Sequence, residues 1–194
     1  MDIEILSIEK DELHKYARVP IKFEVKSILE VELVDDGIRG IKLKEKKLSK
    51  PYERDYDDVG EEAVKEWPNE FDVENWAFYL VEKNNNPIGG ATVAFDSLEV
   101  NMLGGKKDIT VLWDIRVHPD LRGLGIGSSL FKKAVEYSRE KGCKYMKVET
   151  QNINVPACKF YRKMGCRLGE IDRFAYHGDE EVKNDTMLIW YLKL

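Results

Sequence analysis

The stretch from Ile109 to Gly127 constrains the fold of this chain more than any other part of the sequence. Residues Ile109–Val117 have the composition of a β-strand and a His118-Pro119 turn follows them. Glycine then occupies every second position from 123 to 127, where a helical pattern begins. A backbone without side chains lets its N–H groups close around an anion, and the N-terminus of the following helix adds a positive dipole. The sequence therefore predicts a pyrophosphate-binding loop at a strand-to-helix junction.

Two familiar phosphate loops do not match this stretch. A P-loop has Lys-Ser/Thr directly after its last glycine, whereas Gly127 is followed by Ser128 and Ser129. A dinucleotide fingerprint would need a third glycine at position 128, three places after Gly125. For the loop taken alone, a glycine-rich turn that only lets a strand and a helix pack closely stays open as the structural alternative.

The composition indicates one globular domain spanning residues 1–194. Hydrophobic residues make up 43% of the chain, and no Pro-, Gly- or Ser-rich linker divides it. No apolar run is long enough to cross a bilayer and the N-terminus lacks the apolar segment of an export signal, so we expect a cytoplasmic protein without membrane contact. The net charge of −5 disfavours nucleic acid as the main partner and suits a cationic small molecule better. The sequence does not decide between a monomer and a homodimer.

The cysteines and histidines give no sign of a disulfide framework or a metal site. The three cysteines, at positions 143, 158 and 166, form no C-x-x-C pair and are odd in number, so we expect reduced thiols in or near the core. The three histidines lie far apart and in no ligand spacing, so we expect no metal. Among them, His118 precedes a proline in a turn and is expected to be a loop residue rather than a base.

The remaining pattern predicts a mixed α/β (α+β) fold. Strands are expected at Phe23–Leu33, Ile38–Leu48, Trp76–Glu82, Pro87–Phe95, Ile109–Val117, Tyr145–Thr150, Arg167–Tyr176 and Thr186–Leu192, and helices at Asp11–Tyr16, Ile126–Lys141 and Ala157–Met164. For Phe23–Leu33 a helix also stays open. Three consecutive antiparallel strands lead into the glycine loop. The strand after the long helix is reached by a βα crossover and is therefore expected to be parallel to Ile109–Val117.

The segment from Ser49 to Asp72 combines nine carboxylates with interleaved aromatic residues. A charge run of this kind is usually a solvated face. The functional interpretation is a wall of a substrate cleft, since carboxylates and aromatic faces both attract an ammonium group.

A second motif lies downstream of the glycine loop, in the segment E-T-Q-N-I-N-V-P-A-C-K-F-Y-R-K-M-G at residues 149–165. The residues that match the pattern N-x-x-A-x-x-F/L-Y-x-x-x-G are Asn154, Ala157, Phe160, Tyr161 and Gly165. The glycine loop itself supplies R-x-x-G-x-G, starting at Arg122. Together the two motifs resemble those of the GNAT N-acetyltransferase superfamily.

The resemblance implies a GNAT fold with a mostly antiparallel central sheet, a splayed parallel strand pair formed by Ile109–Val117 and Tyr145–Thr150, and flanking helices. It implies acetyl-CoA as co-substrate and no metal. Pantetheine would insert between the splayed strands and bond main-chain groups of Ile115, Arg116 and Val117, where an N–H group would also stabilise the oxyanion. The other residues that the resemblance assigns to acetyl-CoA are Arg122, Gly123, Leu124, Gly125, Ile126, Gly127, Ser128, Asn154, Ala157 and Tyr161.

The resemblance also implies catalytic roles. Tyr161 would protonate the departing thiolate, because a phenol with a pKa of about 10 can donate as the C–S bond breaks. Transfer is then direct and needs no acyl-enzyme, so Cys158 is expected to be structural. The amine substrate arrives protonated, and Asp114 or Glu149 is expected to take its proton. Alternation places Asp114 and Arg116 on one strand face, so an ion pair is the structural alternative for Asp114.

Within the superfamily, four segments resemble streptothricin acetyltransferases: residues 49–58, 113–117, 149–161 and 189–194. These enzymes acetylate the β-lysine arm of a cationic antibiotic and so confer antibiotic resistance. The resemblance implies an acidic, aromatic acceptor wall built from Tyr52, Glu53, Asp55 and Tyr56, with Asp114 and Glu149 also facing the amine. The charged stretch after Tyr176 departs from the pattern and puts the shape of the acceptor pocket in doubt.

Two other interpretations stay open at this stage. The same donor could serve another amine, such as a polyamine, another aminoglycoside-like drug or a protein N-terminus. Alternatively, the chain could be a non-catalytic acetyl-CoA-binding module. Tyr161 and the acids on both strands favour catalysis.

Overall fold

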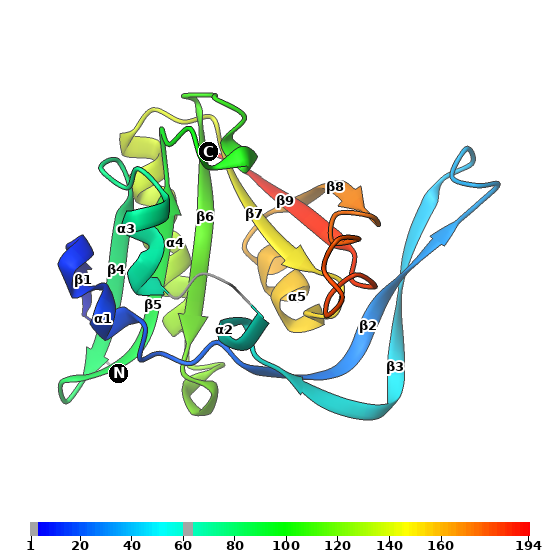
Figure 1. Ribbon diagram of the computed structural model, residues 1–194, viewed down its shortest axis with the longest axis horizontal. Helices are drawn as coiled ribbons and strands as arrows, with labels where there is room; N and C mark the ends of the chain where they lie inside the picture. Colours follow the sequence, from blue (N-terminus) through cyan, green and yellow to red (C-terminus); the bar gives the residue numbers. More distant parts are fainter. Residues whose placement is uncertain (1–3, 60–63) are drawn as a thin grey trace. The chain divides into compact units, whose positions relative to one another are not determined.

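The computed structural model describes residues 4–59 and 64–194, and its contacts divide the chain into two compact units (Figure 1). Unit 1 contains the chain up to Lys22, Asp55–Val148 and Tyr191–Leu194, and unit 2 contains Phe23–Arg54 and Glu149–Trp190. The expectation of one domain over residues 1–194 stays a prediction, because two compact units can be parts of one domain or two separate domains.

The strands form a seven-stranded sheet and a separate two-stranded hairpin. The strands are β1 (Ile5–Ile8), β2 (Phe23–Leu33), β3 (Ile41–Arg54), β4 (Ala77–Lys83), β5 (Asn86–Ala94), β6 (Ile109–Val117), β7 (Tyr145–Gln151), β8 (Arg167–Asp172) and β9 (Met187–Lys193). The large sheet has the order β1-β4-β5-β6-β7-β9-β8, and β2 pairs with β3. Neighbours from β1 to β6 are antiparallel, whereas β6 and β7 are parallel. The predicted mixed, mostly antiparallel sheet with one parallel pair is confirmed.

Helices connect these strands. The α-helices are α1 (Leu13–Tyr16), α2 (Tyr56–Val59), α3 (Trp67–Glu70), α4 (Ile126–Glu140) and α5 (Val155–Lys163). The 3₁₀ turns are η1 (Lys10–Glu12), η2 (Val64–Glu66), η3 (Asn101–Leu103) and η4 (Pro119–Leu121). Helix α4 ends close to its predicted stop because Gly142 adopts a φ of 72°, a left-handed conformation in which a side chain would be strained.

Two strands differ from their expected bounds by more than one residue. The strand expected from Ile38 begins only at Ile41, because left-handed residues from Asp35 to Gly40 close the hairpin turn. It then runs to Arg54, into the acidic segment. The strand expected to reach Tyr176 ends at Asp172, where Oδ1 of Asp172 accepts the N–H of Phe174 at 2.8 Å and turns the chain.

Glycines on β5 bring helices close to both faces of the unit 1 sheet. A Cβ at Gly89 would lie 3.0 Å from Ile126 of α4, and a Cβ at Gly90 would lie 2.4 Å from the ring of Tyr16 of α1. Because successive strand residues point to opposite faces, these two positions admit one helix on each side. Figure 1 shows α4 behind β4, β5 and β6 and α1 in front.

The core of unit 1 on the α1 face is rich in aromatic rings. Trp67, Trp76 and Phe78 are buried, and partly buried Phe71 and Trp113 pack against them. The centroids of Phe71 and Trp113 lie 5.1 Å apart at an interplanar angle of 65°, an edge-to-face arrangement. This cluster covers the strand face that carries the polar groups of β6 described below.

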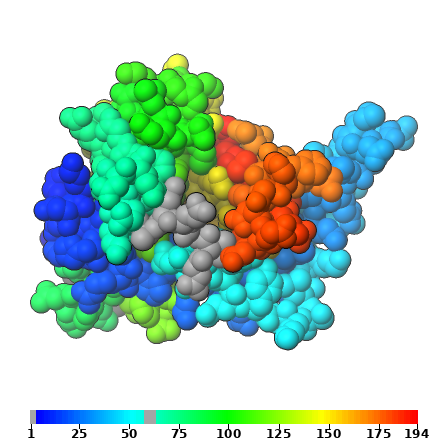
Figure 2. Space-filling view, in the orientation of Figure 1, coloured from blue at the N-terminus to red at the C-terminus, as the bar shows by residue number. Residues whose placement is uncertain are grey.

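Unit 2 joins α5 and β8 to the β2–β3 hairpin. The side chain of Asn152 donates to the carbonyl of Leu29 at 3.0 Å and accepts the N–H of Thr186 at 2.8 Å. Ion pairs such as Lys44–Glu32 and Lys46–Glu30 connect the two hairpin strands. In Figure 2 the tip of the hairpin is the light blue projection of this unit.

The Gly90→Ala variant is expected to lose about 1–3 kcal/mol of unfolding free energy. The added Cβ would meet the Tyr16 ring, which is fully buried and has no room to move aside. Gly178→Ala is the matched control, since a Cβ there meets nothing within 4 Å. Urea denaturation of both variants measures the difference, and equal midpoints would show that the Gly90–Tyr16 contact is not tight.

Candidate active site

The glycine loop lies between β6 and α4 and presents main-chain N–H groups. Gly123 and Gly125 adopt φ values of 82° and 93°, while a Cβ on either would meet nothing within 4 Å, so the backbone conformation and not crowding requires glycine. Gly125 is the N-cap of α4, and the first helical bond runs from the Ser129 N–H to the Gly125 carbonyl at 3.0 Å. The three preceding helical N–H groups therefore have no acceptor within the helix, which is the arrangement that binds an anion in other helices.

Arg122 fixes this loop to its surroundings. Its Nε donates to the carbonyl of Val117 at 3.1 Å and its Nη2 to the carbonyl of Lys22 at 2.7 Å. Burial lowers the pKa of the guanidinium. Sequence reasoning placed Arg122 with the cofactor-binding residues, and its two carbonyl contacts show how it also holds the loop against the end of β6.

A buried charge cluster occupies the second half of β6. Arg116, with 2% of its side chain exposed, donates from Nε to Oδ1 of Asp114 at 3.0 Å and from Nη2 to Oδ2 at 2.7 Å. Its Nη1 donates to the carbonyl of Val19 at 3.0 Å and to Asp57 at 3.1 Å. The hydroxyl of Tyr16 donates to Oδ1 of Asp114 at 2.5 Å. The ion pair that the sequence offered as the structural alternative for Asp114 is present.

A β-bulge accompanies this cluster. Thr92 of β5 pairs with Asp114 and Val93 pairs with Leu112, so Trp113 is the extra residue on β6. A bulge shifts the alternation of the following residues. Gly90 pairs with Arg116, which places Asp114 and Arg116 on the face where Tyr16 lies.

Asp57 is a member of this cluster that sequence reasoning did not single out among the acidic residues. It lies in α2 and is 41% exposed, and burial raises its pKa against the effect of Arg116. The contact joins residues 59 positions apart, and no local pattern marks it.

Glu149 lies in a different environment, in unit 2. Its Oε1 accepts a hydrogen bond from the hydroxyl of Tyr176 at 2.6 Å. Burial raises the pKa of this carboxyl and the hydrogen bond from Tyr176 opposes the rise. Tyr176 was expected to end a strand and was not predicted as a site residue.

Helix α5 carries the second motif. Asn154 is its N-cap, and Oδ1 of Asn154 accepts the N–H of Ala157 at 3.2 Å. Tyr161 is buried, with its ring centroid 5.4 Å from that of Phe160. Burial raises the pKa of Cys158 to about 12, so this residue is a neutral thiol at pH 7, in agreement with a structural role.

The expected acceptor residues lie at the junction of β3 and α2. Tyr52 and Glu53 are consecutive in β3, opposite Val25 and Glu24, so their side chains point to opposite faces of the hairpin. Asp55 accepts the N–H of Asp57 at 3.1 Å, and Tyr56 is the first residue of α2. The structure therefore does not bring Tyr52 and Glu53 to one face.

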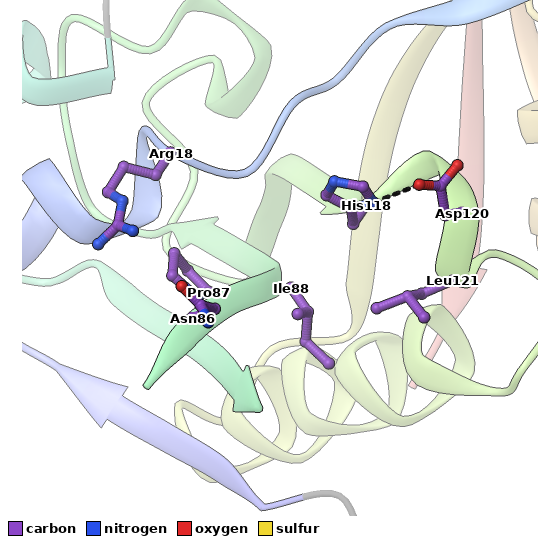
Figure 3. A pocket seen from close by; sticks show the side chains of 7 residues that line it. All are labelled: Arg18, Asn86, Pro87, Ile88, His118, Asp120 and Leu121. Atoms are coloured by element: carbon purple, nitrogen blue, oxygen red, sulfur yellow. Dashed lines mark ion pairs between the residues drawn. The ribbon is translucent and has the colours of Figure 1, made fainter. Parts of the chain in front are cut away.

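A pocket of about 470 Å³ in unit 1 lies beside the turn before the glycine loop (Figure 3). Its lining residues are Arg18, Asn86, Pro87, Ile88, His118, Asp120 and Leu121, none of which was predicted as a site residue. Nδ1 of His118 lies 3.8 Å from Oδ2 of Asp120. His118 is the N-cap residue of η4, in the turn where the sequence placed it.

Two features are absent from the described residues, 4–59 and 64–194. No group of three or more His, Cys, Asp or Glu side chains there could hold a metal ion. No helix of that part of the chain is long and apolar enough to cross a membrane.

Residues 43–166 match the model of the acetyltransferase (GNAT) family. The chain belongs to this family. The streptothricin acetyltransferase of Escherichia coli is 31% identical over 172 residues, which cover 87% of this chain and 84% of that protein. Streptothricin acetyltransferase A of Bacillus subtilis (strain 168) is 30% identical over 151 residues, 77% of this chain and 78% of that protein. The enzyme class predicted from the two motifs, an N-acetyltransferase, is confirmed.

Solved structures of family members confirm the fold. Nourseothricin acetyltransferase superimposes with a TM-score of 0.78 at 20% identity, covering 100% of this chain and 99% of that one. A Bacillus anthracis str. Ames protein, provisionally assigned as a streptothricin acetyltransferase, was crystallised with acetyl coenzyme A. It superimposes with a TM-score of 0.77 at 25% identity over 100% of both chains.

The Arg116→Met variant tests the buried cluster. It is expected to lose about 3–5 kcal/mol of unfolding free energy, because Asp114, with 8% of its side chain exposed, would keep a buried charge without its counterion. The control is Lys44→Met, which removes one partner of an ion pair whose Lys44 side chain is 61% exposed and should change stability little. Urea denaturation compares the two, and similar small losses would refute the importance of the cluster.

Proposed function

We propose that this acetyltransferase uses acetyl-CoA to acetylate an amine of a streptothricin-type cationic antibiotic by direct transfer. The proposed identity of the acceptor rests on the similarity to three streptothricin acetyltransferases over 77%, 80% and 87% of the chain. The donor is supported by the acetyl coenzyme A complex of the 25% identical relative.

The backbone of unit 1 supports a place for the donor. Residues Ile115–Val117 pair with β5 on one edge of β6, whereas the parallel pairing on the other edge joins residues 109–111 to 145–147. Pantetheine could therefore add to the outer half of β6 as an extra strand, with its pyrophosphate at the N–H groups of the glycine loop. In this proposal Gly123–Ser128 bind the pyrophosphate and Asn154, Ala157 and Tyr161 the pantetheine arm.

The two candidate bases differ in their hydrogen bonds. Both oxygens of Asp114 are bonded to Arg116, and Oδ1 also accepts from Tyr16. Glu149 has a neutral donor, Tyr176, and its charge has no ion-pair partner among the described residues. We therefore assign proton acceptance to Glu149 and a positioning role to Asp114.

The proposed reaction proceeds without an enzyme-bound acyl group. Glu149 takes a proton from the substrate ammonium, and the neutral amine attacks the thioester carbonyl. A main-chain N–H of Ile115–Val117 stabilises the oxyanion as the C–N bond forms. The C–S bond then breaks, and Tyr161 gives its proton to the leaving thiolate. The nitrogen loses its second proton to water to give the amide, and the Tyr161 phenolate and the protonated Glu149 then exchange protons with solvent. Asp55 and Tyr56, with whichever of Tyr52 and Glu53 lies on the face toward the substrate, are proposed to attract the cationic acceptor.

Thiol release from acetyl-CoA with a panel of amines tests this function. Streptothricin is expected to give the highest kcat/KM, above spermidine, thialysine and a peptide with an N-terminal alanine. Higher kcat/KM with one of the other amines would change the acceptor while keeping the reaction. Acetyl-CoA binding without thiol release from any amine would identify a non-catalytic binding module.

Tyr161→Phe is expected to lower kcat by about 100-fold, because only the protonation of the thiolate is lost. The KM for acetyl-CoA should stay near that of the wild type. Tyr145→Phe removes a hydroxyl from an exposed position on β7 and is the control. Wild-type turnover in the Tyr161→Phe protein would remove the assigned role.

A further inference from the structure

Tyr176 is directed inward from an otherwise exposed segment of unit 2. Residues 173–181 follow β8, and Tyr176 is half-buried while every other residue of this stretch is exposed. Its hydroxyl donates to Oε1 of Glu149 at 2.6 Å across a separation of 27 residues. An exposed segment that directs one half-buried phenol onto one half-buried carboxylate is a specific arrangement, since surface turns usually leave their side chains in water.

The backbone of the segment fixes this tyrosine in place. The N–H of Asp179 donates to the Tyr176 carbonyl at 3.0 Å, and the N–H of His177 donates to the carbonyl of Phe174 at 3.2 Å. At the far end, Asp185 lies 3.6 Å from Arg54, and the N–H of Thr186 donates to Asn152. The phenol is thus held by consecutive turns that are anchored at both ends.

We propose that Tyr176 is a positioning residue for acetyl transfer, holding Oε1 of Glu149 so that Oε2 faces the substrate ammonium and takes its proton. The inference rests on the proposed function. It adds a role for the segment between β8 and β9.

The hydrogen bond also sets the pH at which Glu149 can accept a proton. Burial raises the pKa of Glu149, and the bond from Tyr176 lowers it. A base must be unprotonated to act, so the rate increases as the pH rises through this pKa. Without the phenol, burial acts alone and the pKa rises further, which moves the ascending limb of the rate profile to higher pH.

Other titratable groups near Glu149 have their own contacts. On β7, Lys147 donates to the carbonyl of Met102 at 2.9 Å. On α5, neutral Cys158 lies 4.0 Å from the carbonyl oxygen of Gln151. In the segment between β8 and β9, Lys183 pairs with Glu180, and Asp185 pairs with Arg54 of β3. Tyr176 is accordingly the group whose removal should change the titration of Glu149.

Profiles of kcat/KM for the amine against pH test the proposal. In Tyr176→Phe the ascending limb is expected to move up by about one pH unit. The kcat/KM should fall by about tenfold below the limb and by less above it, where Glu149 is ionised but no longer held in place. The profile of Glu149→Gln should have no ascending limb. In the control, Tyr145→Phe, the ascending limb should stay at its wild-type pH. A uniform loss at every pH, or an unmoved limb in active Tyr176→Phe protein, would overturn the inference.

Fluorotyrosine at position 176 keeps the side chain nearly unchanged and gives a test with the opposite sign. A more acidic phenol donates a stronger hydrogen bond, so the limb should move to lower pH, and a limb that stays or rises would overturn the inference. This variant also decides the matter if Tyr176→Phe fails to fold. Absence of thiol release by the wild type with every amine would instead refute the proposed function.

Discussion

The buried guanidinium of Arg116 connects more of unit 1 than any other side chain of the site. It contacts Asp114 on its own strand, the carbonyl of Val19 after α1, and Asp57 at the start of the acidic helix α2. A buried ion pair adds little net stability compared with apolar packing, but removing one partner is costly because the other charge stays buried. Arg116 therefore acts chiefly as a constraint, since α1, β6 and α2 have to keep the positions that satisfy its donors.

The two carboxylates on neighbouring strands show how environment separates roles that the sequence leaves equal. Asp114 faces a cation, which stabilises its charge and occupies both of its oxygens. Glu149 is bonded by the phenol of Tyr176, and its burial raises its pKa. A carboxylate whose two oxygens both accept from arginine has no oxygen left for a substrate proton, whereas the raised pKa of Glu149 favours proton acceptance. The choice of Glu149 as the base in our proposal follows from this difference.

Local sequence predicted those features that depend on local chemistry. The bounds of β6 and β2 and the end of α4 before Gly142 follow from patterns a few residues long. The contacts of Asp57 and Tyr176 could not be predicted, because each joins residues that are far apart in sequence and lie in segments with ordinary charged composition. The end of β8 was missed for a different reason: one Asp172 side chain competes with the strand for a backbone N–H.

The position of the glycine loop depends on how closely the first residue of α4 packs on the neighbouring strand β5. Gly89 of β5 lies against Ile126, the first residue of α4, so closely that a Cβ would approach to 3.0 Å. The N–H groups that are proposed to bind a pyrophosphate belong to this first turn. The contact between Gly89 and Ile126 therefore limits how far these groups lie from the sheet. Gly90, the next residue, admits the Tyr16 ring on the opposite face, beside Arg116 and Asp114. One pair of adjacent glycines thus places both the first turn of α4 and the charge cluster, so the glycine loop and the core depend on the same two positions of β5.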